Sequence, residues 1–158
     1  MEMNKPESIW ADGVPQKIDE KDRISNSELA DMAITYIMKN IIIPKGFKIE
    51  QGFPRKEVPN IICKRDGIVY AIMVVPSLFP DYITINDEFR LKLVSACLEH
   101  NTVPLYAPIG YKSIDEERAK AKLALKGDVF LTSFPGFVKL TNNEKQDFSF
   151  TDDNLFRP

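Results

Sequence analysis

Two apolar stretches joined by an Asp-Gly pair constrain the fold of this chain more than any other feature. Asn60–Arg65 and Ile68–Val75 flank Asp66-Gly67. Asp-Gly between apolar runs is typical of a tight hairpin, because both central residues must adopt positive φ. We therefore expect the two stretches to pair as antiparallel strands. Ile68–Val75 is apolar at every position, so both of its faces should be covered, as in the centre of a layered α/β sheet.

Three helices are predicted around this hairpin. Ser25–Glu28 has the pattern of a capping box, in which two side chains satisfy free backbone amides, and Pro44 and Gly46 should end the helix that it opens. A second helix is predicted to begin at Asn86 or Asp87 and to run through Glu99. Ser113–Glu116 is another capping box, and Gly127 closes the third helix. The side chains expected in the core are Leu29, Met32, Ala33, Tyr36, Ile37 and Ile41 of the first helix and Phe89, Leu93, Val94, Ala96 and Cys97 of the second.

Three further β-like stretches complete the predicted order of elements. Phe47–Gly52 precedes the hairpin, Thr102–Ala107 follows the second helix, and Asp128–Thr132 would add a last short edge strand. The order is then αβββαβα with one extra edge strand. Such an alternation predicts an α/β fold with three layers, in which helices flank a mixed sheet.

Length and composition indicate one domain between two polar ends. The chain has 158 residues, of which 44% are hydrophobic and 28% charged, as in ordinary globular proteins. We place the domain at residues 25–140, after an N-terminal arm of residues 1–24 and before a polar tail of residues 141–158. The apolar residues expected to hold the arm against the domain are Ile9, Trp10 and Val14.

Charge, hydropathy and cysteine spacing argue against several classes of protein. A net charge of −2 gives no overall positive field for nucleic acid or an anionic membrane. The longest apolar run, Ile68–Val75, is far shorter than the roughly 20 residues of a transmembrane helix. Met1–Ile9 lacks the apolar core of a secretory signal, and Cys63 and Cys97 have no paired spacing for a disulfide or zinc site. We expect a cytoplasmic protein with no cofactor and no membrane contact.

The segment Pro59–Val75 resembles the hairpin of the restriction-endonuclease-like, or PD-(D/E)xK, nuclease superfamily, and the predicted order of elements resembles that family as well. In these nucleases a Pro-Asp pair opens one strand. An acidic residue and a Lys two places apart lie on the next strand, on one face because strand side chains alternate. The carboxylates hold a divalent metal, and the Lys helps to position or activate the attacking water.

The residues that carry catalysis in that family are replaced in this chain. The family's Asp falls on Asn60, its acidic residue on Ile72 and its Lys on Val74. A hard divalent cation requires oxygen ligands, and these three side chains offer one neutral carbonyl. The resemblance covers residues 25–132 and therefore implies a nuclease-like scaffold without catalysis, kept for binding, assembly or regulation. A mixed α/β domain unrelated to nucleases would show the same alternation of elements.

Three acidic or titratable residues are candidates for a different site. A relocated metal site could recruit Glu50 and Glu57, although solvated loop charges explain both residues. His100 is the single histidine and lies at a predicted helix end, where an imidazolium interacts favourably with the helix dipole. No Ser or Cys is visibly tied to it, so a nucleophilic triad has no support.

A run of basic residues is the feature that most suggests nucleic acid. Arg118, Lys122 and Lys126 recur every four residues, so one edge of the predicted third helix would be basic. Ordinary helix construction, with acids at the start and bases at the end, explains the same pattern. The candidate nucleic-acid surface comprises Lys112, Arg118, Lys120, Lys122 and Lys126. The aromatic residues that would either stack on bases beside it or pack in the core are Tyr106, Tyr111, Phe134 and Phe137.

The sequence therefore favours a catalytically inactive nuclease-like domain that serves as a binding or assembly module and is not an enzyme. Two alternatives stay open. One is a divergent metal-dependent nuclease, in which Glu50 and Glu57 would converge with another oxygen donor on one cation. The other is a protein-interaction domain without nucleic-acid binding, which would use the arm around Trp10 or the segment from Phe148 to Phe156. The partner would be nucleic acid at the basic edge, another protein or a second copy of the chain.

Overall fold

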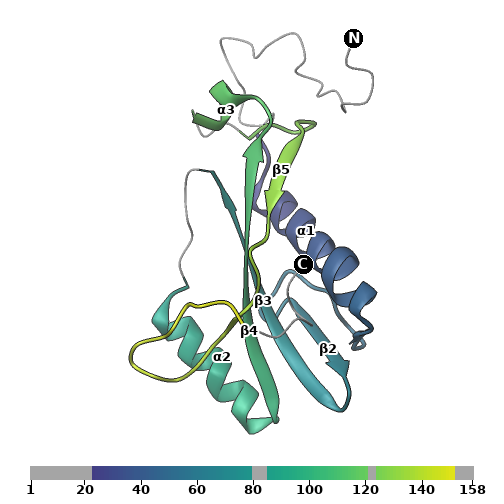
Figure 1. Cartoon of the computed structure of the whole chain (residues 1–158), viewed down its shortest axis with the longest axis vertical. Helices are drawn as coiled ribbons and strands as arrows, with labels where there is room; N and C mark the ends of the chain where they lie inside the picture. Colours follow the sequence, from purple (N-terminus) through teal and green to yellow (C-terminus); the bar gives the residue numbers. More distant parts are fainter. Residues whose placement is uncertain (1–22, 80–84, 121–123, 152–158) are drawn as a thin grey trace.

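The computed structural model describes residues 23–79, 85–120 and 124–151, which form an α/β structure around one mixed sheet (Figure 1). The strand order is β1-β2-β3-β4-β5, and β6 pairs with β4. β3 and β4 run parallel, whereas the other neighbouring strands are antiparallel. Trp10 and the rest of the predicted arm up to residue 22 lie outside the described residues.

Helices and strands alternate along the chain, as expected for an α/β protein. They are α1 (Asn26–Ile37), a π-helical turn (Met38–Ile42), a 3-10 turn (Ile43–Lys45), β1 (Lys48–Ile49), β2 (Ile61–Arg65), β3 (Ile68–Leu78), α2 (Asp87–Glu99), β4 (Thr102–Ser113), α3 (Glu116–Lys120), β5 (Phe130–Ser133) and β6 (Val138–Lys139). No helix in the described parts of the chain is long and apolar enough to cross a membrane.

The capping box predicted at the start of α1 is confirmed. The Glu28 amide donates to Ser25 Oγ at 3.0 Å, and the Ser25 amide donates to Glu28 Oε1 at 3.3 Å. The helical path continues through the π and 3-10 turns and stops at Gly46, whose φ of 84° is left-handed. Gly46 therefore ends this path as the sequence predicts, because glycine enters that region without a steric cost.

The hairpin is also confirmed, and it places β3 in the centre of the sheet. Asp66 and Gly67 have φ values of 53° and 80°, and Arg65 pairs with Ile68 across the turn. β3 then pairs with β2 on one side and with β4 on the other.

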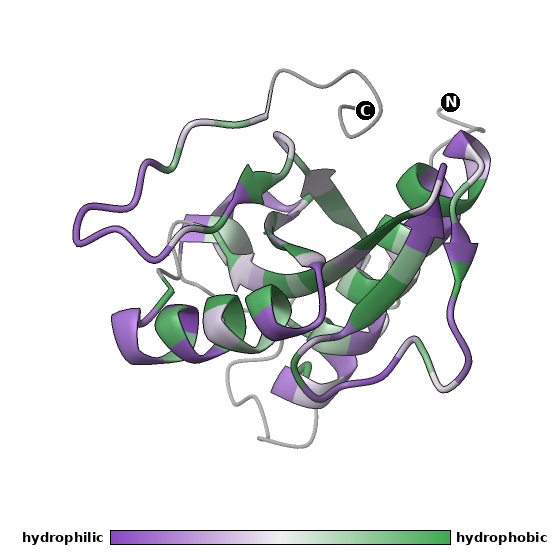
Figure 2. Cartoon of the chain, turned by 90° about the horizontal axis from the view of Figure 1, so that it is seen from below, coloured by the Kyte–Doolittle hydropathy of each residue, from purple (hydrophilic) through white to green (hydrophobic). Residues whose placement is uncertain are grey.

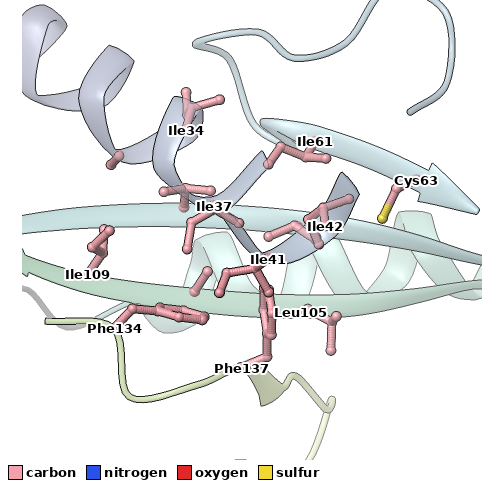
Figure 3. Packing of buried hydrophobic residues seen from close by; sticks show 14 of the residues in the cluster. Ile34, Ile37, Ile41, Ile42, Ile61, Cys63, Leu105, Ile109, Phe134 and Phe137 are labelled. Atoms are coloured by element: carbon pink, nitrogen blue, oxygen red, sulfur yellow. The ribbon is translucent and has the colours of Figure 1, made fainter. Parts of the chain in front are cut away.

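Alternate residues of β3 enter two separate apolar clusters, one under each long helix. Tyr70, Ile72 and Val74 belong to the cluster that contains the buried face of α1, whereas Ala71 and Met73 pack with α2. Figure 3 shows the first cluster, where isoleucines of α1 and the following turn lie over the strands. Helices thus cover both faces of the sheet, as predicted for an α/β fold with three layers.

The prediction of a third helix reaching Gly127 is wrong. α3 ends at Lys120 within the described part, and Leu125 forms an isolated antiparallel bridge with Arg23. The Ile24 amide donates to the Ala124 carbonyl at 2.8 Å. Because Leu125 is fully buried and its backbone meets the chain entering α1, this stretch is extended rather than helical. Ser113 is the last residue of β4 and does not form the predicted capping box. Its Oγ accepts a hydrogen bond from the Asp115 amide.

β4 continues past the Ala107 end that we predicted. Pro104 and Pro108 lie within it, although proline cannot donate to a ladder. The Pro104 carbonyl accepts from the Leu140 amide, so this proline turns its backbone away from β3. Pro108 follows four residues later, so its backbone is turned to the same side as that of Pro104. At this position β4 pairs with neither β5 nor β6 on that side. No ladder bond is lost, and the strand passes through both prolines.

The buried face of α2 differs from the predicted one. Leu93, Val94 and Cys97 are buried as expected, but Phe89 is 53% exposed and Ala96 is exposed as well. Arg90 takes a core position with 1% exposure. Its guanidinium donates to the carbonyls of Thr141 and Asn143 and to Asp87 Oδ1, and it thereby holds the segment after β6 against α2.

The segment from Thr141 to Thr151 follows β6. Its first part is mostly hydrophilic and forms the purple loop at the left of Figure 2. The Phe148 ring meets the Tyr106 ring edge-on at 6.3 Å between centroids. The Thr151 amide donates to the Phe137 carbonyl at 2.8 Å. These contacts bring Phe150 beside Gly136, at the sheet.

Gly67→Ala should lower the free energy of unfolding by about 1–2 kcal/mol, because an alanine Cβ at a φ of 80° is strained. Chemical denaturation followed by circular dichroism measures this loss. Gly110→Ala is the matched control, since Gly110 lies in β4 and an added Cβ would meet Ser77 Oγ at an ordinary 3.9 Å. Equal losses in the two variants would contradict the role of the turn.

Candidate functional site

Asn60, Ile72 and Val74, the three positions compared above with the nuclease signature, lie side by side in the sheet. The Asn60 amide donates to the Ile72 carbonyl at 2.9 Å, and the Val74 amide donates to Asn60 Oδ1 at 2.8 Å. Asn60 therefore continues the β2–β3 ladder by one step with its side chain. The structure thus brings Asn60, Ile72 and Val74 together, at the place where β2 begins.

Asn60 uses its side-chain amide to hold the preceding loop. Its Nδ2 donates to the carbonyls of Arg55, Lys56 and Glu57 at 3.2, 3.0 and 3.3 Å. The residue is 4% exposed, so water cannot replace these bonds. A carboxylate only accepts hydrogen bonds, and it would face three carbonyl oxygens here. The asparagine is therefore required by the loop, and an ionised aspartate does not suit this environment.

Ile72 and Val74 belong to the core rather than to a site. They are 0% and 7% exposed and pack in the cluster under α1. A neighbouring hollow of about 420 Å³ lies between Asn26, Leu29 and Ala30 of α1 and residues 74–78 of β3. Its lining is mainly apolar, and Asn26 and Ser77 supply its polar side chains. A divalent cation would find no carboxylate ligand in this lining.

The residues considered for a relocated metal site do not converge in the described part of the chain. Glu57 is 83% exposed and lies 3.8 Å from the Arg55 guanidinium. The described residues contain no group of three or more His, Cys, Asp or Glu side chains able to hold a metal ion. Burial, with a smaller contribution from Glu50, raises the pKa of the Cys63 thiol to about 12, so this thiol stays protonated at neutral pH. His100 is exposed and follows the last residue of α2.

The described basic residues of the candidate surface lie on different elements and not along one helix. Lys126 lies beyond α3 and is 3.6 Å from Glu28 Oε1, whereas Lys112 lies in β4. Lys120 is exposed at the end of α3. Lys122 and the side chain of Arg118 lie outside the described part of the structure. The aromatic residues Tyr106, Tyr111, Phe134 and Phe137 are all buried, so they pack in the core and offer no stacking platform.

An open groove lies on the opposite face of the sheet from α1. In Figure 1, α2 lies beside one half of the β3–β4 pair. β5 lies beside the other half, which α2 does not cover. The groove has a volume of about 400 Å³ in this second half. Its lining residues come from the end of β3 and the residue after it, the second half of β4, β5, the turn between β5 and β6, and the segment after β6: Ser77, Phe79, Pro108, Ile109, Gly110, Tyr111, Lys112, Leu131, Thr132, Ser133, Pro135 and Phe150.

Strand alternation explains the shape and character of this groove. Ile109 and Tyr111 enter the cluster under α1, so Gly110 and Lys112 lie on the groove side of β4. Gly110 has no side chain and leaves the floor open. Phe79, Leu131 and Phe150 expose 41, 56 and 37% of their surfaces on its walls. These exposed fractions are high for large apolar residues that gather in one place.

Lys112 is the cation of the groove. Its Nζ lies 4.7 Å from the centroid of the Phe79 ring, a cation–π distance. Within the described residues, no carboxylate forms an ion pair with this ammonium. The groove therefore combines an apolar lining with one positive charge that is free to meet an anionic group.

Sequence reasoning named Lys112, Tyr111 and the segment around Phe150 as separate candidates, and it did not predict that they share one groove. Phe79, Leu131 and Phe150 stand far apart in the chain, and each resembles an ordinary core or surface residue on its own. Only the pairing of Lys112 with Leu131, and of Leu78 with Tyr111, brings them to one surface.

Comparison with known proteins identifies one related family. The model of a family described as Domain of unknown function (DUF8840) matches residues 27–140, which is more than half of the chain. No curated protein and no solved structure matches the chain.

Asn60→Asp should destabilise the protein by about 2–4 kcal/mol at neutral pH, because an ionised carboxylate would be buried against three carbonyls. Such a site raises the pKa of the new carboxyl, so the folded state binds more protons than the unfolded state. Stability should therefore fall as the pH rises from 4 to 7. Urea denaturation at several pH values measures this slope.

Asn40→Asp is the matched control for this substitution. Asn40 is exposed, and its Nδ2 makes one bond, to the Tyr36 carbonyl at 3.1 Å. We expect a change of about 0.5 kcal/mol or less. An Asn60→Asp protein as stable as this control at pH 7 would show that the loop does not depend on the Asn60 amide.

Proposed function

The chain belongs to the family described as Domain of unknown function (DUF8840), and we propose that it is a nuclease-like domain without catalysis that serves as a binding or assembly module. The observation that carries this proposal is the structural role of Asn60, Ile72 and Val74. The first holds a loop through three carbonyls, and the other two fill the core. Each of the three positions performs a structural task that a metal ligand or a catalytic lysine would abolish.

The element order supports the nuclease-like part of the proposal. A capped helix precedes three antiparallel strands, and a second helix then leads into β4, which runs parallel to β3. This order is compatible with the restriction-endonuclease-like arrangement that the hairpin residues suggest. Fold alone assigns no activity, so the binding role rests on the groove.

The groove between β3, β4 and β5 is the surface that we assign to binding. Its volume of about 400 Å³ and its largely apolar walls are those of a ligand or peptide-anchor site. Lys112 supplies one charge, which orients a bound group rather than providing most of the affinity.

A protein segment suits this surface better than a nucleic acid. Phosphate binding gains affinity from several cations that release counterions together, whereas the groove has one lysine and the chain has a net charge of −2. Asp115, Glu116 and Glu117 follow shortly after Lys112 and would repel a phosphate backbone. The proposed partner is therefore a protein.

A native gel with labelled single- and double-stranded DNA and RNA, with and without manganese, tests this function. We expect neither cleavage nor a salt-sensitive shift. Metal-dependent cleavage that disappears in Glu50→Ala would overturn the catalytically inactive assignment. Lys92→Ala is the control, because Lys92 lies on α2 and pairs with Glu88. A salt-sensitive shift that is lost in Lys112→Ala and retained in Lys92→Ala would indicate that the partner is nucleic acid and not protein.

A further inference from the structure

We propose that the groove binds the chain's own segment Ile9–Val14, with Trp10 as its apolar anchor and Asp12 as the partner of Lys112. This inference rests on the groove of the proposed function and names what fills it when no other protein is bound. It assigns to the chain a built-in occupant that a partner must displace. Four observations carry it: the lining, the free cation, the composition of the segment and the place where the arm joins the body.

The lining requires an occupant with a large apolar group. Phe79, Leu131 and Phe150 are exposed around one hollow of about 400 Å³, and water contact with this much apolar surface is unfavourable. Phe150 is held there from behind, because its ring lies 3.5 Å from the Cβ position of Gly136 and the next amide donates to Phe137. An aromatic side chain inserted between these walls would bury apolar area on both partners.

The free cation requires a negative charge close to that apolar group. Lys112 stacks on Phe79 and pairs with no described carboxylate. A carboxylate on the occupant would gain an ion pair at the edge of an apolar surface, where Coulomb attraction is stronger than in water. The occupant should therefore carry an aromatic residue and an acid within a few residues of each other.

The segment Ile9–Val14 has this composition. Trp10 is the single tryptophan of the chain, Ile9 precedes it, and Asp12 follows two residues later. Residues 1–22 contain six acids and three lysines, so this part of the chain is acidic as a whole. Its charge is opposite to that of Lys112, and attraction of this kind favours encounter and orientation.

The arm joins the body beside the part of the chain that leads into β5, and β5 lines the groove. Arg23 bridges Leu125, and Leu125 precedes the first residue of β5 by five positions. The six positions from Leu125 to Leu131 span at most about 21 Å, whereas the nine from Val14 to Arg23 span up to about 30 Å. The segment is therefore long enough to reach Leu131, and its tether gives it a high effective concentration there.

Fluorescence of Trp10 in the full chain tests this inference directly, because no other tryptophan contributes. We expect a blue-shifted emission and a several-fold weaker quenching by acrylamide than in urea. Leu131→Asp should move both values to those of the unfolded chain while circular dichroism stays native, since Leu131 is already 56% exposed. Leu98→Asp, at a 61% exposed leucine on α2, should leave the emission unchanged.

A charge exchange tests the ionic part. Lys112→Glu and Asp12→Lys should each increase acrylamide quenching, and the two together should restore the wild-type value. A structural effect of Lys112 alone would not be rescued by Asp12→Lys. Failure of the double variant to restore the emission would remove the ion pair from the proposal.

Three outcomes would overturn the inference as a whole. The first is a solvent-like Trp10 in the wild-type chain, and the second is an emission that Leu131→Asp does not change. The third is a blue shift that disappears when a dimer dissociates on dilution, because the groove would then bind the arm of a second copy. Each outcome leaves the nucleic-acid gel unaffected, and cleavage in that gel would reject the proposed function without changing the Trp10 result.

Discussion

The rest of the structure depends on β3, a strand whose side chains are apolar on both faces. Such a strand is stable only where two layers cover it, so α1 and α2 must lie on opposite sides of the sheet. β2 pairs with only its first half, up to Ile72. Beyond that point Asn60 Oδ1 accepts from Val74, and Pro76, two residues on, has no N–H to leave unpaired. The open edge of β3 thus offers few donors to another strand.

The two helices cover the sheet unequally, and this inequality creates the groove. α1 and its π and 3-10 turns lie over the strands on one face, and their isoleucines meet the strands (Figure 3). On the other face, the Arg90 guanidinium donates hydrogen bonds to the carbonyls of Thr141 and Asn143. These bonds hold the segment after β6 beside α2. The half of the sheet around Gly110 and Lys112 therefore stays open. This apolar surface is open because α2 packs against the first half of β4, where Tyr106 lies, and not against the second half.

The buried positions Asn60, Ile72 and Val74 lie in a different part of the sheet from the groove, and the two places have opposite characters. Asn60, Ile72 and Val74 are buried and satisfied, so replacement of any one disturbs the fold. Lys112, Phe79 and Leu131 are accessible and contribute little to the core. An ionised carboxylate at any of these three buried positions would be costly, whereas the apolar side chains of Ile72 and Val74 add packing.

Local sequence signals determined the elements that depend on a few neighbouring residues. The Ser25–Glu28 box, the Asp66-Gly67 turn and the apolar run of β3 could be predicted because capping, positive φ and strand burial are short-range requirements. The tertiary structure alone decided the end of α3, where Leu125 must meet Arg23, and the burial of Arg90, which requires carbonyls about fifty residues away. It also decided the groove, since Phe79, Leu131 and Phe150 share a surface only through the register of β3, β4 and β5. That register is a long-range property, and no short window of the sequence contains it.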